Sequence, residues 1–225
     1  MIEELLPPNV VADDMIGDDL SACLMPEEAF QMQAAIESRR KEFTTTRACA
    51  RRALLRLGLP PAPILQGTNR EPIWPPGIVG SLTHCPDYRA AAVAKRSDWL
   101  SIGIDAEIHD ALPTDVVDRV LIAQEISWLA SSSRSSHWDR VIFSAKESIY
   151  KAWFPLTQLW LDFEDVAITL NPEDGRFNAD LRVVPPPLYG NTLDKLMGRF
   201  RICNGFVLTA VTIPVPGHEQ YSGIV

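Results

Sequence analysis

The strongest constraint on the fold lies near the C-terminus, where Asn204-Gly205 separates the apolar runs 199–203 and 206–213. Asn-Gly is a preferred two-residue loop of tight antiparallel hairpins because both of its residues tolerate positive φ angles. A second such break, Asp174-Gly175, divides residues 166–184 in the same way. The last quarter of the chain is therefore predicted to form antiparallel hairpins.

Upstream of these hairpins the chain mixes helical and strand patterns. Three long stretches have the apolar spacing or composition of helices: residues 26–57, 114–130 and 137–153. Three short apolar runs between polar breaks are typical of strands: residues 78–82, 90–94 and 100–106. Gly58 and the prolines after it should end the first helix, and Pro155 should end the last one.

The order of these segments indicates the fold class. Strands and helices do not alternate regularly, so an α+β fold is favoured over a doubly wound parallel sheet. Strands within 88–106 and 163–213, each with one long helix, would allow two similar lobes. We expect an N-terminal lobe over residues 29–100 and a C-terminal lobe over 101–225.

The net charge of −8 is concentrated at the N-terminus. Residues 1–28 contain eight acidic residues and no Lys or Arg, so acidic and basic residues balance in the rest of the chain. Because charge runs are usually solvated, we expect residues 1–28 to be a solvated, partly mobile lead-in. The balanced remainder does not indicate binding to nucleic acid.

Targeting and redox features indicate a cytoplasmic protein. The N-terminus lacks the basic and apolar regions of a signal peptide, and no run of about 18 apolar residues could span a membrane. The four cysteines are scattered, with no CxxC pair. Such spacing favours reduced thiols over a zinc site or a disulfide framework.

Two carboxylates, Asp105 and Glu107, alternate along a predicted strand and therefore share one face, which Gly103 leaves free of bulk. Ile102 and Ile104 point to the opposite face. Neighbouring carboxylates repel one another unless a cation lies between them, and oxygen ligands suit Mg²⁺. The alternative is that both acids end a strand in solvent.

A second motif is Phe143-Ser-Ala-Lys146-Glu147-Ser-Ile-Tyr150-Lys151. Glu147 and Lys151 are four residues apart on a predicted helix, and an isolated pair of this kind is usually a surface salt bridge. Aromatic residues surround these charges, which favours a cleft over open surface.

The turn Gly80-Ser-Leu-Thr83-His84 and three arginines, Arg39, Arg47 and Arg70, could bind an anion. Arg39 and Arg47 are about 80° apart around a helix, so they could converge on one phosphate. The alternatives are a buried turn and surface arginines. A phosphate-bearing ligand with Mg²⁺ would use all of these motifs, yet the sequence has no Walker or GxGxxG loop.

The pair Gly103-Ile-Asp-Ala-Glu107 and Phe143 to Lys151, in this order and spacing, resembles the signature of the 4′-phosphopantetheinyl transferases. The pattern is G-[IV]-D-x-E followed by [FW]-[SCT]-x-K-E-[AS]-x-x-K. The length and the arginine-rich first helix are similar to the Sfp/EntD-type monomeric group, closest to the actinobacterial carrier-protein activators. The resemblance covers roughly residues 37–213.

This resemblance implies a fold of two similar α+β lobes with the active site between them. It implies transfer of the 4′-phosphopantetheine arm of coenzyme A to a serine of an acyl, aryl or peptidyl carrier protein, with release of adenosine 3′,5′-bisphosphate. Such carriers serve fatty-acid, polyketide, nonribosomal peptide or siderophore synthesis. It further implies a monomer without nucleic-acid or membrane partners.

The resemblance also assigns the site residues. Asp105, Glu107 and Glu147 are the expected Mg²⁺ ligands, and Glu147, directly or through a metal-bound water, is the candidate base. The residues expected to contact coenzyme A are Arg39, Arg47, Arg70, Thr83, His84, Asp105, Lys146 and Lys151, of which Lys146 and Lys151 lie by its phosphates. Those expected to line the pantetheine slot are Phe143, Tyr150, Trp160 and Leu161.

One position departs from the family pattern. Close members carry a lysine near the end of the Ile64-Leu65 run, where this chain has Gln66. Arg70 is expected to supply the missing charge. Two other functions are considered: a coenzyme A-binding regulatory module without transferase activity, and a Mg²⁺-dependent phosphohydrolase.

Overall fold

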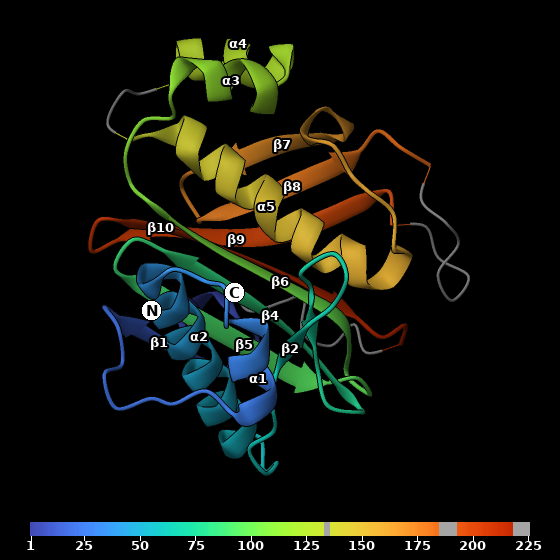
Figure 1. The fold of residues 1–225 in the computed structure, drawn as a ribbon. Helices are drawn as coiled ribbons and strands as arrows, with labels where there is room; N and C mark the ends of the chain where they lie inside the picture. The colour runs from blue at the N-terminus through green and yellow to red at the C-terminus, as the bar shows by residue number, and fades with distance from the viewer. Residues whose placement is uncertain (133–135, 185–192, 218–225) are drawn as a thin grey trace.

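A computed structural model describes residues 1–132, 136–184 and 193–217 (Figure 1). The described residues form five α-helices and ten strands. The helices are α1 (Pro26–Gln31), α2 (Glu37–Arg56), α3 (Thr114–Val120), α4 (Ala123–Ser131) and α5 (Trp138–Thr157). Two short 3₁₀ helices are η1 (Ile2–Leu5) and η2 (Phe163–Asp165).

The strands form three sheets, and the mixture of helices with antiparallel sheets confirms the α+β prediction. The largest has the order β6-β10-β9-β8-β7, from β6 (Trp99–Ile108), β7 (Val166–Asn171), β8 (Arg176–Leu181), β9 (Lys195–Cys203) and β10 (Phe206–Pro214). The second has the order β1-β5-β4, from β1 (Val11–Ile16), β4 (Ile78–Cys85) and β5 (Tyr88–Lys95). A short hairpin joins β2 (Leu65–Gln66) to β3 (Pro72–Ile73).

The C-terminal hairpins form as predicted. Strands β9 and β10 pair in antiparallel register, and the loop residues Asn204 and Gly205 have φ angles of 51° and 80°. Positive φ at both positions is the geometry that matches the right-handed twist of the flanking strands. Strands β7 and β8 pair in the same antiparallel manner.

The two larger sheets are stacked, with one 20-residue helix outside each of them (Figure 1). Strand β5 alternates accordingly: Ala91 and Val93 join the cluster under α2, whereas Ala90 and Ala92 face the space between the sheets. From the other sheet, β6 and β10 contribute Ile104 and Leu208 among other residues to that central core. The strand period of two therefore produces the layer order α2, sheet, sheet, α5.

The N-terminal segment corrects one prediction. Residues 1–28 are not a solvated lead-in, because β1 pairs with β5 along its whole length and Ile2 is completely buried. Its acidic side chains pair with arginines: Glu28 with Arg51, Asp13 and Asp19 with Arg52, Glu3 with Arg56, and Asp18 with Arg89. The cluster of like charges is explained by basic partners that are distant in sequence, which a local charge count cannot reveal.

Two predicted helices are broken in the structure. The stretch 26–57 contains α1 and α2, separated because Ile36 takes an extended backbone conformation, and 114–130 is divided into α3 and α4 at Leu121. Conversely, α5 continues past Pro155 to Thr157 and ends at Gln158, whose φ is 56°. A proline in the last turn removes a single helical hydrogen bond, so it does not stop the helix at once.

No helix of the described residues combines the length and apolar character needed to cross a membrane. All four cysteines are free thiols.

Helix α5 packs on β6 with a matched spacing. Gly103 lies under Ser148 and Ala152, the Asp105 carboxylate bonds Ser144, and Glu107 bonds Arg140. Two residues of a strand span about 6.7 Å, and four residues of a helix span about 6 Å. Each step of two residues forward along β6 is therefore matched by a step of four residues back along α5.

Gly103 sets how closely α5 can approach. A Cβ atom at this position would lie 1.9 Å from the Ser148 carbonyl oxygen, which belongs to the helix backbone and cannot rotate away. Gly103→Ala is therefore expected to lower the free energy of unfolding by about 3 kcal/mol, measured by urea denaturation.

The control is Thr169→Ala, at an exposed position of β7, which should change the free energy of unfolding by less than about 0.5 kcal/mol. Equal stability of the two variants would show that α5 does not depend on the missing side chain.

Candidate active site

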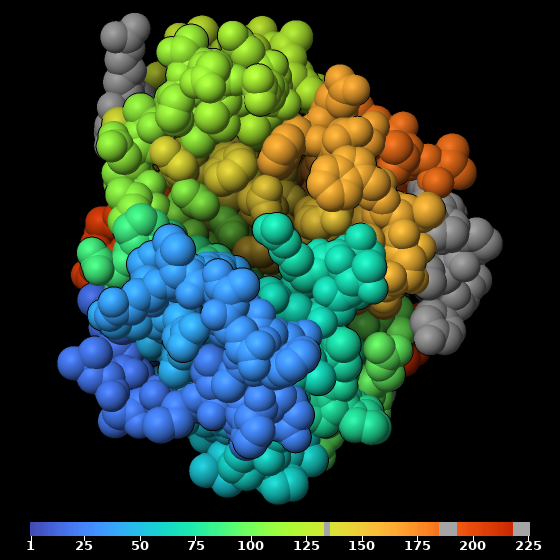
Figure 2. All heavy atoms as spheres, in the orientation of Figure 1, coloured from blue at the N-terminus to red at the C-terminus, as the bar shows by residue number. Residues whose placement is uncertain are grey.

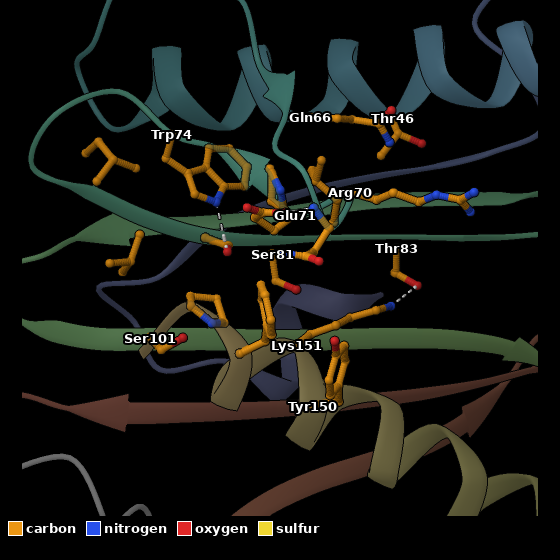
Figure 3. Close-up of a pocket in the computed structure, with 18 of the residues that line it drawn as sticks. Thr46, Gln66, Arg70, Glu71, Trp74, Ser81, Thr83, Ser101, Tyr150 and Lys151 are labelled. Atoms are coloured by element: carbon orange, nitrogen blue, oxygen red, sulfur yellow. Dashed lines mark hydrogen bonds between the residues drawn. The ribbon is translucent and has the colours of Figure 1, made fainter. Parts of the chain in front are cut away.

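A pocket with a volume of about 440 Å³ lies between α2, the loop after β2, strand β4 and α5. Figure 2 shows the surface hollowed where the blue-to-teal N-terminal part meets the yellow α5. In Figure 3, Arg70 of the loop after β2 and Trp74, which follows β3, lie on one side of the pocket, and Tyr150 and Lys151 of α5 lie on the other, with Thr83 of β4 beside Lys151.

Strand β4 reaches the site through its hydroxyl side chains. Ser81 Oγ accepts a hydrogen bond from Ile104 N at 3.1 Å, and Thr83 Oγ1 accepts one from Ala106 N at 3.0 Å. These hydroxyls satisfy backbone N–H groups of β6 and join the two sheets at the pocket. The Gly80–His84 motif is thus both a wall of the pocket and the connection between the sheets.

Asp105 is the centre of the site's hydrogen bonds. Its buried carboxylate accepts bonds from Lys151 Nζ at 2.7 Å, Ser144 Oγ at 2.7 Å and Thr83 Oγ1 at 3.3 Å. Lys151 Nζ also donates to the Ile104 carbonyl oxygen at 3.2 Å. A buried carboxylate needs such partners, and these three come from β4 and α5.

The two other predicted metal ligands are near enough to Asp105 to be affected by its charge. Glu107 bonds Arg140 Nη1 at 3.0 Å, yet burial and the charge of Asp105 raise its pKa to about 7. Burial and the same negative charge also raise the pKa of Glu147. The carboxylates therefore repel one another through a partly desolvated space, and a cation there would relieve that repulsion.

No three Asp, Glu, His or Cys side chains of the described ranges are close enough to hold a metal on their own. Lys151 and Arg140 instead pair with Asp105 and Glu107. Any ion at this site would need further oxygen ligands from a bound molecule, which suits an ion that keeps several non-protein ligands.

Positive charge collects at the far end of the larger pocket. Arg39 contacts His84 Nε2 directly, and Glu42 lies 3.4 Å from the same ring nitrogen. Arg47 is buried, stacks over the Phe43 ring at 3.6 Å and donates to the Ile64 carbonyl oxygen at 3.0 Å. Among the described residues no carboxylate forms an ion pair with Arg47, and Glu28, whose charge acts on it, pairs with Arg51 instead, so an anion could bind the guanidinium directly.

Burial and the positive charges of Arg39 and Lys151 lower the pKa of His84 to about 4. His84 is therefore neutral at physiological pH. A negatively charged ligand would reverse part of this shift.

Gln66 and Arg70 both line the larger pocket. The backbone of Gln66 exchanges two hydrogen bonds with the Gln31 side chain, which fixes β2 against α1. Arg70 has a φ of 68° and forms no hydrogen bond or ion pair with another described side chain. It is placed where it could supply a charge that Gln66 lacks.

Lys146, which is predicted to lie beside the phosphates, does not line the larger pocket and instead lines a smaller one beside it. Its ammonium group is buried and pairs with Glu125 at 2.9 Å. Lys146 and Lys151 are five residues apart, or about 140° around a helix, so they point to different sides of α5.

A second pocket of about 240 Å³ lies beside the first. Three of the four residues predicted for a narrow apolar slot line it: Tyr150, Trp160 and Leu161. Phe143 does not line this pocket and packs against the ring of Phe163, one of its wall residues, at 5.8 Å between centroids. Glu147 and Tyr150 line both pockets, so the two pockets are neighbours that share these residues.

Several residues of the site were not predicted. Arg140 bonds Glu107, Ser144 bonds Asp105, Glu125 pairs with Lys146, and Trp74 and Arg96 line the larger pocket. Ser144 lies within the recognised motif, and helical spacing places Arg140 one turn before it. Glu125 lies far from the motifs in sequence, and Trp74 precedes the Gly80–His84 turn without belonging to it, so neither gives a comparable signal.

Comparison with known proteins identifies the family. Residues 26–94 match the model of the 4′-phosphopantetheinyl transferase N-terminal domain, and residues 101–192 match that of the 4′-phosphopantetheinyl transferase superfamily. The chain is 45% identical over 222 residues to the 4′-phosphopantetheinyl transferase Svp of Streptomyces mobaraensis, covering 96% of this chain and 90% of that protein.

Two further relatives agree with this result. The 4′-phosphopantetheinyl transferase PptT of Mycobacterium tuberculosis is 44% identical over 222 residues, covering 95% of this chain and 98% of that protein. Enterobactin synthase component D of Escherichia coli strain K12 is 32% identical over 152 residues, covering 66% and 68%. The resemblance seen in the two motifs is confirmed, and the chain belongs to the 4′-phosphopantetheinyl transferase superfamily.

Proposed function

We propose that this protein transfers the 4′-phosphopantetheine group of coenzyme A to a serine of an apo carrier protein, with Mg²⁺, and releases adenosine 3′,5′-bisphosphate. The observation that carries this proposal is the pair of neighbouring pockets, which share Glu147 and Tyr150. The larger pocket holds the arginines and His84, and the smaller one has Tyr150, Trp160, Leu161 and Phe163 in its walls, which suits the nucleotide and the arm of coenzyme A in that order.

The nucleotide end is assigned to the larger pocket. Arg39, Arg47 and His84 are available to the 3′-phosphate, and Arg70 extends the positive charge along the loop. Thr83 and Lys151 lie next to Asp105, where the pyrophosphate would pass. The smaller pocket then receives the thin, uncharged arm between Tyr150 and Leu161.

Asp105, Glu107 and Glu147 are the residues that would hold Mg²⁺ together with pyrophosphate oxygens. Bound there, the ion would neutralise charge that develops on the leaving bridging oxygen. Lys151 supports the same charge from α5, and Ser144 and Thr83 hold Asp105 in place. The serine oxygen of the carrier attacks phosphorus as the bond to the bridging oxygen breaks, and Glu147 is the candidate acceptor of the serine proton.

The stacked sheets, each with one long helix, support the proposal of two similar lobes with the site between them. The boundary near residue 100 and a monomeric state remain parts of this proposal.

The deciding experiment incubates the protein with coenzyme A, Mg²⁺ and an apo carrier protein. A carrier mass increase of one phosphopantetheine group supports the transferase. Release of phosphate by water, with the carrier unchanged, would favour a phosphohydrolase, and binding of coenzyme A alone would favour a regulatory module.

Variants Asp105→Asn, Glu107→Gln and Glu147→Gln should each lose nearly all transfer activity in saturating Mg²⁺. Removing a metal carboxylate costs several kcal/mol of transition-state stabilisation, or about a thousandfold in kcat/KM. Asparagine is preferred to alanine at Asp105 because it leaves hydrogen-bond partners for Ser144 and Thr83.

The matched control is Glu173→Gln, an exposed carboxylate at the turn between β7 and β8, which should keep full activity. If any of the three site variants turns over at a near-normal rate while folded, the three-ligand assignment is wrong.

His84 offers a separate test of the 3′-phosphate position. Because its pKa of about 4 is lowered partly by nearby positive charges, a bound phosphate should raise that pKa. We expect a clear upward shift with adenosine 3′,5′-bisphosphate and a smaller one with the 5′-monophosphate, measured by NMR titration. The three other histidines serve as internal references. Equal shifts with both nucleotides would place the 3′-phosphate elsewhere.

A further inference from the structure

Lys146 has no hydrogen left to offer a ligand. Its ammonium donates to the Val120 carbonyl oxygen at 2.8 Å and to the Phe163 carbonyl oxygen at 2.8 Å, and it pairs with Glu125 Oε2 at 2.9 Å. A lysine ammonium has three hydrogens, and each has a protein acceptor here. The residue is 2% exposed, so water does not complete its bonding.

Glu125 is engaged to the same degree. Its Oε1 accepts a bond from Ile168 N at 2.8 Å, and its Oε2 accepts one from Ile122 N at 3.0 Å in addition to the Lys146 contact. The carboxylate is 1% exposed. The pair therefore connects α5 with the junction of α3 and α4, with η2 and with β7.

These connections define the smaller pocket. One of its walls is α5, with Lys146, Glu147 and Tyr150, and the other is the segment from Trp160 to Val166. Lys146 bonds the middle of that segment at Phe163. Outside this bond, α5 holds the segment by the Trp153 bond to the Leu159 carbonyl oxygen at 3.0 Å and by ring contacts of Tyr150 and Phe143.

We infer that Lys146, paired with Glu125, is a positioning residue that sets the width of the pantetheine slot and does not bind the phosphates of coenzyme A. This inference rests on the proposed function. Glu147, the next residue in the motif, lines both pockets. Two adjacent residues of α5 therefore have different roles: Glu147 takes part in the reaction, and Lys146 positions the wall of the slot.

The test separates the two ends of coenzyme A. Adenosine 3′,5′-bisphosphate has the phosphates of the nucleotide end and lacks the arm, whereas coenzyme A has both. The variant is Lys146→Met with Glu125→Leu, because removing the lysine alone leaves a carboxylate buried without its partner. Lys146→Met with Glu125→Gln, which also removes both charges and keeps an acceptor for one of the two backbone N–H groups, is measured beside it.

The expected result is a change in the ratio of two dissociation constants, measured by calorimetry on folded protein. Coenzyme A should bind about tenfold more weakly to both variants, and adenosine 3′,5′-bisphosphate should bind within about twofold of the unchanged protein. A general loss of stability would not change this ratio, because both ligands bind the same folded fraction.

Lys151→Met is the matched control on the same helix. Lys151 lies beside Asp105 and Thr83 in the larger pocket, so its loss should weaken binding of both ligands.

Two results would overturn the inference: an equal loss for both ligands in the Lys146 variants, which indicates a phosphate contact, or no loss for either. If the unchanged protein binds neither ligand, the proposed function itself fails, and this outcome is distinct from the other two. Should the variant with Glu125→Leu not fold, the ratio for Lys146→Met with Glu125→Gln decides.

Discussion

The carboxylate of Asp105 is the interaction on which the site depends. It is buried at the contact of β4, β6 and α5 and accepts hydrogen bonds from Thr83, Ser144 and Lys151. Burying a carboxylate is unfavourable unless such donors replace its water. The donors come from β4 of the second sheet and from two turns of α5. The Asp105 carboxylate, which the reaction needs, therefore also aligns β4 and α5 with β6.

That arrangement requires α5 to lie close to β6. Gly103 permits the approach, and small residues on the helix face, Ser144, Ser148 and Ala152, accept it. The hydroxyls of Ser81 and Thr83 then take the place of carbonyl acceptors for β6. A larger residue at any of these positions would separate the carboxylates from the lysine that balances their charge.

Much of this structure could be predicted because its signals are local. The Asn204-Gly205 hairpin, the strands around 78–106 and the shared face of Asp105 and Glu107 follow from periods of two and from turn chemistry. The pairing of residues 1–28 could not be predicted, because their partners are arginines of α2 and β5. The charge composition of a segment gives its number of acidic residues, but it does not show which basic residues, distant in sequence, form ion pairs with them.

Lys146 shows the same limit within a recognised motif. A motif groups residues by sequence, and a helix then separates them by angle: Lys146 and Lys151 differ by about 140°. Helical geometry alone thus argues that only one of the two lysines can face Asp105. Which one does so depends on Glu125, which lies twenty-one positions before Lys146 and belongs to no motif.

The two ion pairs that the lysines of α5 form consequently differ in kind. Lys151 lines the larger pocket, where a ligand can compete with Asp105 for it, whereas the hydrogens of the Lys146 ammonium and both oxygens of Glu125 already bond groups of the protein. A lysine whose ion pair a ligand can rearrange, such as Lys151, is suited to binding. A lysine whose bonds are all satisfied within the protein, such as Lys146, is suited to holding the structure in place.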